Sequence, residues 1–93
     1  MTLHILGTSP SDHATFESCR ATLTESDTLL LLEEGVYWAL PKHRIELSRL
    51  PARVVVLQPD SDARGVSTEG LSEVDDAGFV ELSIQHERSI SWY

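Results

Sequence analysis

With 93 residues, of which 41% are hydrophobic and 24% charged, the chain is sized for a single domain spanning residues 1–93 and is too apolar to be disordered. Its 7 Lys and Arg stand against 15 Asp and Glu, and this net charge of −8 argues against direct binding to nucleic acid or to anionic membranes. No run approaches the roughly 20 apolar residues that cross a bilayer.

The first quarter of the chain predicts a strand followed by a helix. Leu3–Leu6 is a short apolar strand, and a hydroxyl-rich turn comes after it. This turn lacks the glycine pattern and the lysine of a phosphate-binding loop, so we expect an ordinary connection. In the segment that follows, Phe16, Cys19 and Leu23 recur at helical spacing, which predicts a helix with one buried face.

The two most regular apolar runs lie in the middle of the chain. Thr28–Leu32 stands between polar turns, as is typical of a strand buried on both faces. Arg53–Leu57 contains three consecutive valines and predicts another strand. Between these runs we expect Glu33–Gly35 to form a solvated turn and Val36–Leu40 to begin a short helix that Pro41 limits.

The remaining segments continue the alternation of strands and helices. We expect one or two helical turns at residues 60–65, a short strand at Leu71–Val74, a helix at residues 76–86 and an edge strand at Ile90–Tyr93. The apolar residues of the last helix are Phe79, Val80, Leu82 and Ile84. This pattern predicts a small three-layer α/β domain with a mainly parallel sheet of four or five strands. So few residues leave sheet edges uncovered, which favours association with other chains.

Residues that could carry chemistry are few. The four histidines and Cys19 show no metal-ligand spacing, so neither a metal nor another cofactor is expected. A single cysteine excludes an internal disulfide and fits a reducing compartment. The N-terminal residues also lack the basic and apolar regions of a signal peptide. We therefore expect a cytoplasmic protein.

Cys19 is the one residue that could act as a nucleophile or carry sulfur. It lies about two turns into its predicted helix, where the helix dipole no longer favours a thiolate. It shares a face with Phe16 and Leu23, while Arg20 points about 100° away. These features favour a small, packed thiol, and a catalytic role stays open as the alternative.

Five segments, taken together, resemble the TusB/DsrH family. They are LHILGTSPSD, the Glu17–Cys19 triplet ESC, TLLLLEEGVYWAL, RVVVLQPDSDARGV and GFVELSIQHERSISWY. They cover nearly the whole chain and occur in the family's order. The resemblance implies a fold of the DsrE/F/H type.

The resemblance also implies a function in sulfur transfer. The family supplies one subunit of a sulfurtransferase complex, a dimer of heterotrimers that also contains TusC/DsrF-like and TusD/DsrE-like subunits. The complex takes persulfide sulfur from a TusA-like donor and passes it to a TusE/DsrC-like acceptor. In the Tus branch the sulfur reaches 2-thiouridine at the tRNA wobble position, and in the Dsr branch it belongs to sulfur oxidation. The principal persulfide cysteine lies on the TusD/DsrE-like partner, and Cys19 matches a cysteine that only some family members have.

Aromatic residues indicate where partner subunits would bind. Val36, Tyr37 and Trp38 are expected at or near a surface that a sister subunit covers, because Tyr and Trp combine large apolar area with a polar group. The alternative is that this run packs only on its own sheet. Trp92 and Tyr93 pose the same choice, since terminal aromatic residues fray unless they dock. Two rival functions stay open: an autonomous sulfurtransferase that uses Cys19, and an interaction module without sulfur chemistry.

Overall fold

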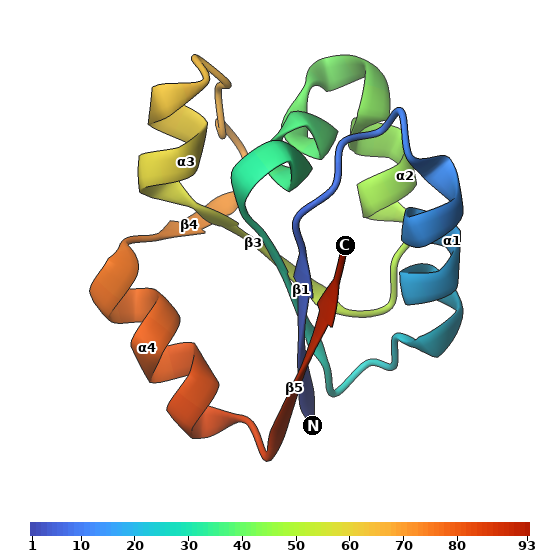
Figure 1. Cartoon of the computed structure of the whole chain (residues 1–93), viewed down its shortest axis with the longest axis vertical. Coiled ribbons are helices and arrows are strands. Elements are labelled where there is room, and N and C mark those ends of the chain that lie inside the picture. The colour runs from blue at the N-terminus through green and yellow to red at the C-terminus, as the bar shows by residue number, and fades with distance from the viewer.

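Five parallel strands form one sheet in the computed structural model, which describes all residues from Met1 to Tyr93 (Figure 1). The strands are β1 (Thr2–Leu6), β2 (Thr28–Leu31), β3 (Arg53–Leu57), β4 (Ser72–Val74) and β5 (Arg88–Trp92). The helices are α1 (His13–Thr22), α2 (Arg44–Ser48), α3 (Gln58–Ala63) and α4 (Asp76–Gln85), with 3₁₀ segments η1 (Glu33–Ala39) and η2 (Pro41–His43). The predicted α/β class and parallel sheet are confirmed.

The strand order β4-β3-β2-β1-β5 shows how the chain moves through the sheet. It starts at β1 near the centre, advances outward to β4, and then returns through α4 to place β5 on the free side of β1. The direction of winding therefore changes between β1 and β5. In open α/β sheets this switch point, at the carboxyl ends of the strands, is where binding sites usually form.

Strand side chains alternate between two apolar clusters. On β2 and at the residue after it, Leu29 and Leu31 point to one face of the sheet, while Leu30 and Leu32 point to the other. All four are nearly inaccessible to solvent, as the unbroken apolar run predicted. The sheet is therefore the middle layer of three.

The two outer layers differ in size. The larger apolar cluster joins the sheet to α1, η1 and α2, whereas the smaller one joins it to α4, which supplies Leu82 and the partly buried Phe79. Figure 1 shows α1 and α2 on one side of the strands and α4 on the other. One helix thus covers most of the second face, and β5 is largely exposed.

The segment after β2 differs from the prediction. A 3₁₀ helix begins directly at Glu33, instead of a turn at Glu33–Gly35 followed by a helix. Glu33 adopts a positive φ of 49°, and its N–H donates a hydrogen bond of 2.6 Å to Asp60. Gly35 lies directly against the end of β1, where a Cβ would overlap the Leu6 carbonyl oxygen. Because glycine has no Cβ, the chain can bend this close to β1.

Candidate functional site

Cys19 lies on the buried face of α1. Asp12 caps this helix by accepting a hydrogen bond of 3.2 Å from the N–H of Thr15, which fixes the start of the helix and hence the face that Cys19 occupies. The cysteine is 1% exposed and belongs to the larger apolar cluster. Burial raises the pKa of the Cys19 thiol to about 12, so the thiol is protonated near neutral pH.

No cation offsets this effect on Cys19. The neighbouring Arg20 turns to the surface, where its guanidinium donates three hydrogen bonds to the Glu17 carboxylate. These hydrogen bonds lower the pKa of Glu17, so the charge of Arg20 is already engaged. In this conformation Cys19 is neither accessible nor activated, which favours the packed-thiol interpretation.

The carboxyl edge of the sheet carries acidic groups. The Tyr93 ring packs against Gly7, at the point where the chain winding changes direction. Partial burial, followed by the charges of Glu33 and Asp60, raises the pKa of the Tyr93 phenol.

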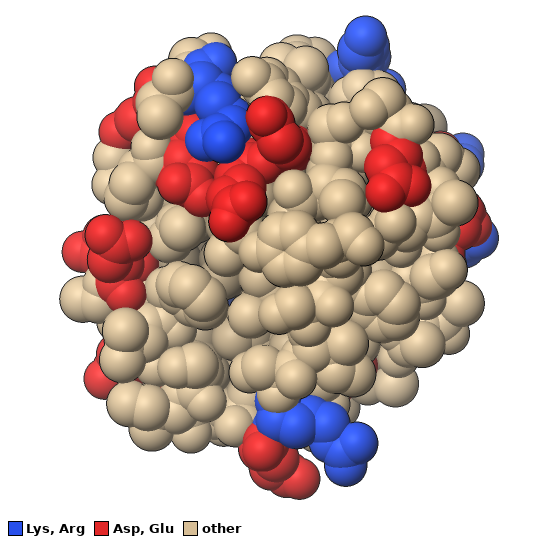
Figure 2. Space-filling view, viewed as in Figure 1, with Lys and Arg blue, Asp and Glu red and all other residues tan.

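Figure 2 shows acidic side chains gathered over α3 and η1 around a basic one, and Arg64 pairs there with Glu34 at 3.3 Å. Such an edge repels anions, so it suits a cationic partner and not a phosphate group.

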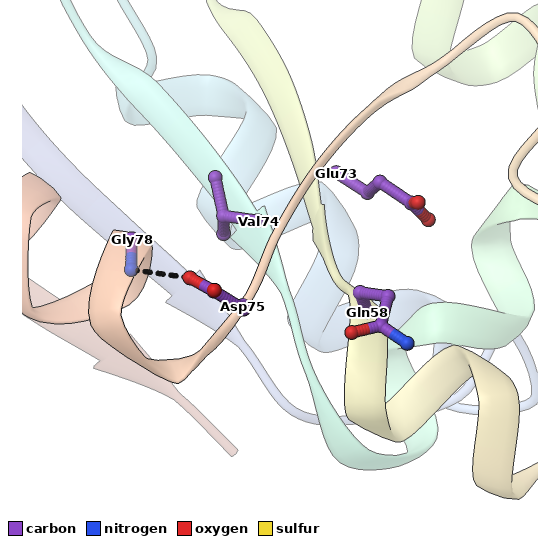
Figure 3. A pocket seen from close by; sticks show the side chains of 5 residues that line it. All are labelled: Gln58, Glu73, Val74, Asp75 and Gly78. Carbon is purple, nitrogen blue, oxygen red and sulfur yellow. Dashed lines mark hydrogen bonds between the residues drawn. The ribbon is translucent and has the colours of Figure 1, made fainter.

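A second feature at the carboxyl ends is an open hollow between α3, β4 and α4. Figure 3 shows it, and the residues that line it are Gln58, Glu73, Val74, Asp75 and Gly78. Its acidic groups already serve the fold: Asp75 caps α4 by accepting 2.8 Å from the N–H of Gly78, and Glu73 accepts from the hydroxyl of Thr68. With one apolar lining residue, the hollow lacks the apolar walls of a small-molecule pocket.

Histidines serve the structure in two places. His4 and Asp27 are buried together, with 3.2 Å between Nε2 and Oδ2, and the Trp92 indole N–H donates to His4 Nδ1 at 3.1 Å. His86 bonds through its two nitrogens to Leu82 and Thr28, which ties the end of α4 to the start of β2. No group of three or more His, Cys, Asp or Glu side chains is placed to hold a metal ion.

The predicted interface residues fall into two sets. Val36 and Trp38 are 0% and 1% exposed, and Trp38 stacks on Phe16 with 3.9 Å between ring centroids. They belong to the chain's own core, which corrects the expectation that these two side chains face a sister subunit. The physical reason is that the 3₁₀ helix folds back over the sheet and α1. Tyr37 and Trp92 are half-buried and Tyr93 is 63% exposed, so these three residues can reach a partner.

Two features escaped the prediction from sequence. The His4–Asp27–Trp92 network joins residues far apart in the chain, and only the polar His4 within an apolar strand hinted at it. The second feature is an exposed apolar row on α4, visible in the sequence as Ala77, Val80 and Ile84 at helical spacing. No helix has the length and apolar character needed to cross a membrane.

Fold and site define a small three-layer α/β protein whose single thiol is buried. A family model described as "DsrH like protein" matches residues 8–89. Protein TusB of Enterobacter sp. (strain 638) is 39% identical over 95 residues, which cover 97% of this chain and 99% of the relative. Protein TusB of Pectobacterium parmentieri is 38% identical over 97 residues, with the same coverage. The chain belongs to the TusB/DsrH family.

A solved structure agrees with this assignment. The solution NMR structure of protein Tm0979 from Thermotoga maritima superposes with a TM-score of 0.70 at 26% sequence identity. The match covers 94% of this chain and 95% of the other. The fold that the resemblance implied is therefore shared over nearly the whole domain.

Proposed function

We propose that this protein is an accessory subunit of a cytoplasmic sulfurtransferase complex. Its partners are a TusC/DsrF-like and a TusD/DsrE-like subunit, assembled as a dimer of heterotrimers. The complex passes persulfide sulfur from a TusA-like donor to a TusE/DsrC-like acceptor, for 2-thiolation of the tRNA wobble uridine. The similarity to proteins named TusB over 97% of the chain supports this function.

The burial of Cys19 is the observation that supports an accessory role. In a relay step, an acceptor thiolate attacks the outer sulfur of a persulfide, the S–S bond breaks, and the donor leaves as a thiolate. A residue in such a step must be ionised and must be reached by another protein. Cys19 is 1% exposed and its burial raises the pKa of the thiol to about 12, which supports a transferring cysteine on a partner subunit. This also disfavours an autonomous sulfurtransferase.

A second candidate is a DsrH-type subunit in dissimilatory sulfur oxidation. The match of residues 8–89 to the family model described as DsrH like favours it. Neighbouring genes distinguish the two branches, because sulfite reductase genes beside this one would indicate oxidation. A stand-alone interaction module without sulfur chemistry would lack TusC/DsrF-like and TusD/DsrE-like neighbours.

Sulfur transfer through the intact complex tests the accessory role. Serine at position 19 removes the nucleophilic sulfur, keeps a similar volume and costs about 1–2 kcal/mol of stability if its hydroxyl is buried without a partner. We expect Cys19→Ser to leave transfer of labelled sulfur from a persulfidated donor to the acceptor largely intact.

The matched control is the same substitution at the cysteine of the TusD/DsrE-like subunit, which should abolish transfer. A loss of about tenfold or more with Cys19→Ser, in a complex that still assembles, would mean that Cys19 carries sulfur. Failure of the wild-type chain to co-elute with the two partner subunits would refute the complex itself.

A further inference from the structure

Helix α4 has two apolar faces. Its inner face carries Phe79 and Leu82, which pack on the sheet. Val80 and Ile84 are four residues apart and share a face, while Leu82 lies about 200° from Val80, on the opposite side of the helix. Val80 is 57% exposed and Ile84 is 76% exposed, and Ala77 extends the same row by one turn.

This outer row, Ala77–Val80–Ile84, is unusual for a helix that has solvent on one side. Such helices present polar residues opposite their core face, and a helix that is apolar all round is normally buried. Ile84 is the most exposed large apolar side chain of the protein. The row therefore indicates a helix that is covered on both sides in its working state.

The charges around the row indicate what covers it. Between Arg64 and Arg88 the chain has six Asp and Glu residues and no Lys or Arg. Asp76 and Glu81 flank the row directly on α4, and the chain as a whole carries −8. A second copy packed on this face would bring like-charged residues together, which is destabilising. A surface with an aliphatic centre and a Lys/Arg rim would satisfy both the apolar row and the carboxylates.

We propose that the outer face of α4 is the docking surface for a sister subunit with an aliphatic centre and a basic rim. This inference rests on the proposed function and moves the main contact away from Val36 and Trp38. Figure 2 shows mainly uncharged side chains on the visible side of α4, with acidic ones near its border.

Val80→Asp tests the apolar row, and Ile45→Asp is its matched control. Val80 and Ile45 are both β-branched helix residues with 57% exposure, but Ile45 lies on α2, on the other side of the sheet. The measurement is affinity for the co-expressed TusC-like and TusD-like chains of the same organism. We expect about tenfold or greater weakening with Val80→Asp and an unchanged affinity with Ile45→Asp. Ile84→Glu is a second variant at the more exposed position, and thermal melting of each free chain checks that it folds.

Glu81→Lys tests the charge argument, with Glu25→Lys as its control. Both side chains are exposed, and both substitutions change the net charge equally. Only Glu81 borders the row, so Glu81→Lys should weaken binding and reduce its dependence on salt. Glu25→Lys should do neither.

The outcomes separate this inference from the proposed function. If the wild-type chain does not bind the two subunits, both are overturned. If it binds and Val80→Asp binds as well as wild type, or no worse than Ile45→Asp, only the α4 surface is overturned. A free wild-type dimer that Val80→Asp dissociates would assign the surface to a second copy and also overturn the inference.

Discussion

At the scale of single residues, the most constrained group is the buried pair His4 and Asp27. The Trp92 indole N–H can only donate, so His4 Nδ1 accepts and the ring proton lies on Nε2, facing Asp27. The backbone N–H groups of Thr2 and Thr24 also donate to Asp27, at 2.9 and 3.0 Å. One carboxylate thus connects the start of β1, the loop before β2 and, through His4, the end of β5.

These contacts predict how stability depends on pH. Burial opposes ionisation of Asp27, but the hydrogen bonds from Thr2, Thr24 and His4 outweigh it and lower the pKa of Asp27 below its ordinary value of 3.8. As pH falls, the Asp27 carboxylate is therefore protonated in the unfolded state before it is protonated in the folded state. The stability that Asp27 contributes is present above about pH 4. It is lost as pH falls through the lower pKa of the folded state.

Asp27→Asn should cost about 2 kcal/mol near neutral pH, because it removes charge-assisted hydrogen bonds. It should also flatten the loss of stability between about pH 5 and pH 2. Urea unfolding at several pH values measures both effects. Glu25→Gln, at an exposed side chain without hydrogen bonds, should retain the wild-type slope. If the stability of Asp27→Asn fell with pH as steeply as that of the wild type, Asp27 would not be the group responsible for the loss of stability at low pH.

At the scale of elements, η1 shows how closely the chain packs at the carboxyl edge. Gly35 rests on the end of β1, and the N–H of Leu32 donates to the Leu6 carbonyl at 3.2 Å. Arg44 fixes the loop before β4. The two terminal nitrogens of its guanidinium donate hydrogen bonds to the main-chain carbonyls of Ser67 and Glu69, and its Nε donates to the carbonyl of Ala39. The first contact leaves no room for a Cβ at position 35.

Gly35→Ala should destabilise the protein by about 2 kcal/mol or more, because the new Cβ overlaps the Leu6 carbonyl oxygen and either η1 or β1 must move. Gly65→Ala is the control: it has a positive φ of 65° but open space around it, so we expect a cost of about 1 kcal/mol. Chemical denaturation compares the two variants. Equal losses of unfolding free energy in the two variants would show that the close contact of Gly35 with β1 does not determine the effect of Gly35→Ala.

At the scale of the whole molecule, Trp38 joins two layers. Its ring stacks on Phe16 of α1 and lies over the sheet, so η1 and α1 share one packing unit. The indole N–H finds no hydrogen-bond acceptor, which leaves packing as the contribution of this side chain. Loss of the ring should therefore affect the fold of the free subunit before it affects assembly.

Trp38→Ala should destabilise the free chain by about 3–5 kcal/mol. Trp38→Phe keeps an aromatic ring on Phe16 and removes a donor without an acceptor, so it should cost distinctly less. Thermal and urea unfolding of the isolated subunit measure both changes. A Trp38→Ala chain that folds normally but fails to bind its partner subunits would restore the interface interpretation of Trp38.

The sequence by itself determined the order of elements and the fold class. The apolar runs Thr28–Leu32 and Val55–Leu57 are buried on both faces of the sheet. Unbroken apolar character and short length identify such strands in the sequence without knowledge of their neighbours. The spacing of Phe16, Cys19 and Leu23 likewise predicted the buried face of α1. Family membership followed from the same collinear segments.

Only the tertiary structure decided which apolar residues stay exposed. Val36 and Trp38 resemble an interface in sequence, yet η1 folds over α1 and buries them; Val80 and Ile84 resemble core residues, yet α4 turns them outward. The choice depends on how elements far apart in the chain pack, and local spacing carries no information on which of two apolar faces meets the sheet. The His4–Asp27–Trp92 network was hidden for the same reason, since its members meet only when β5 returns beside β1.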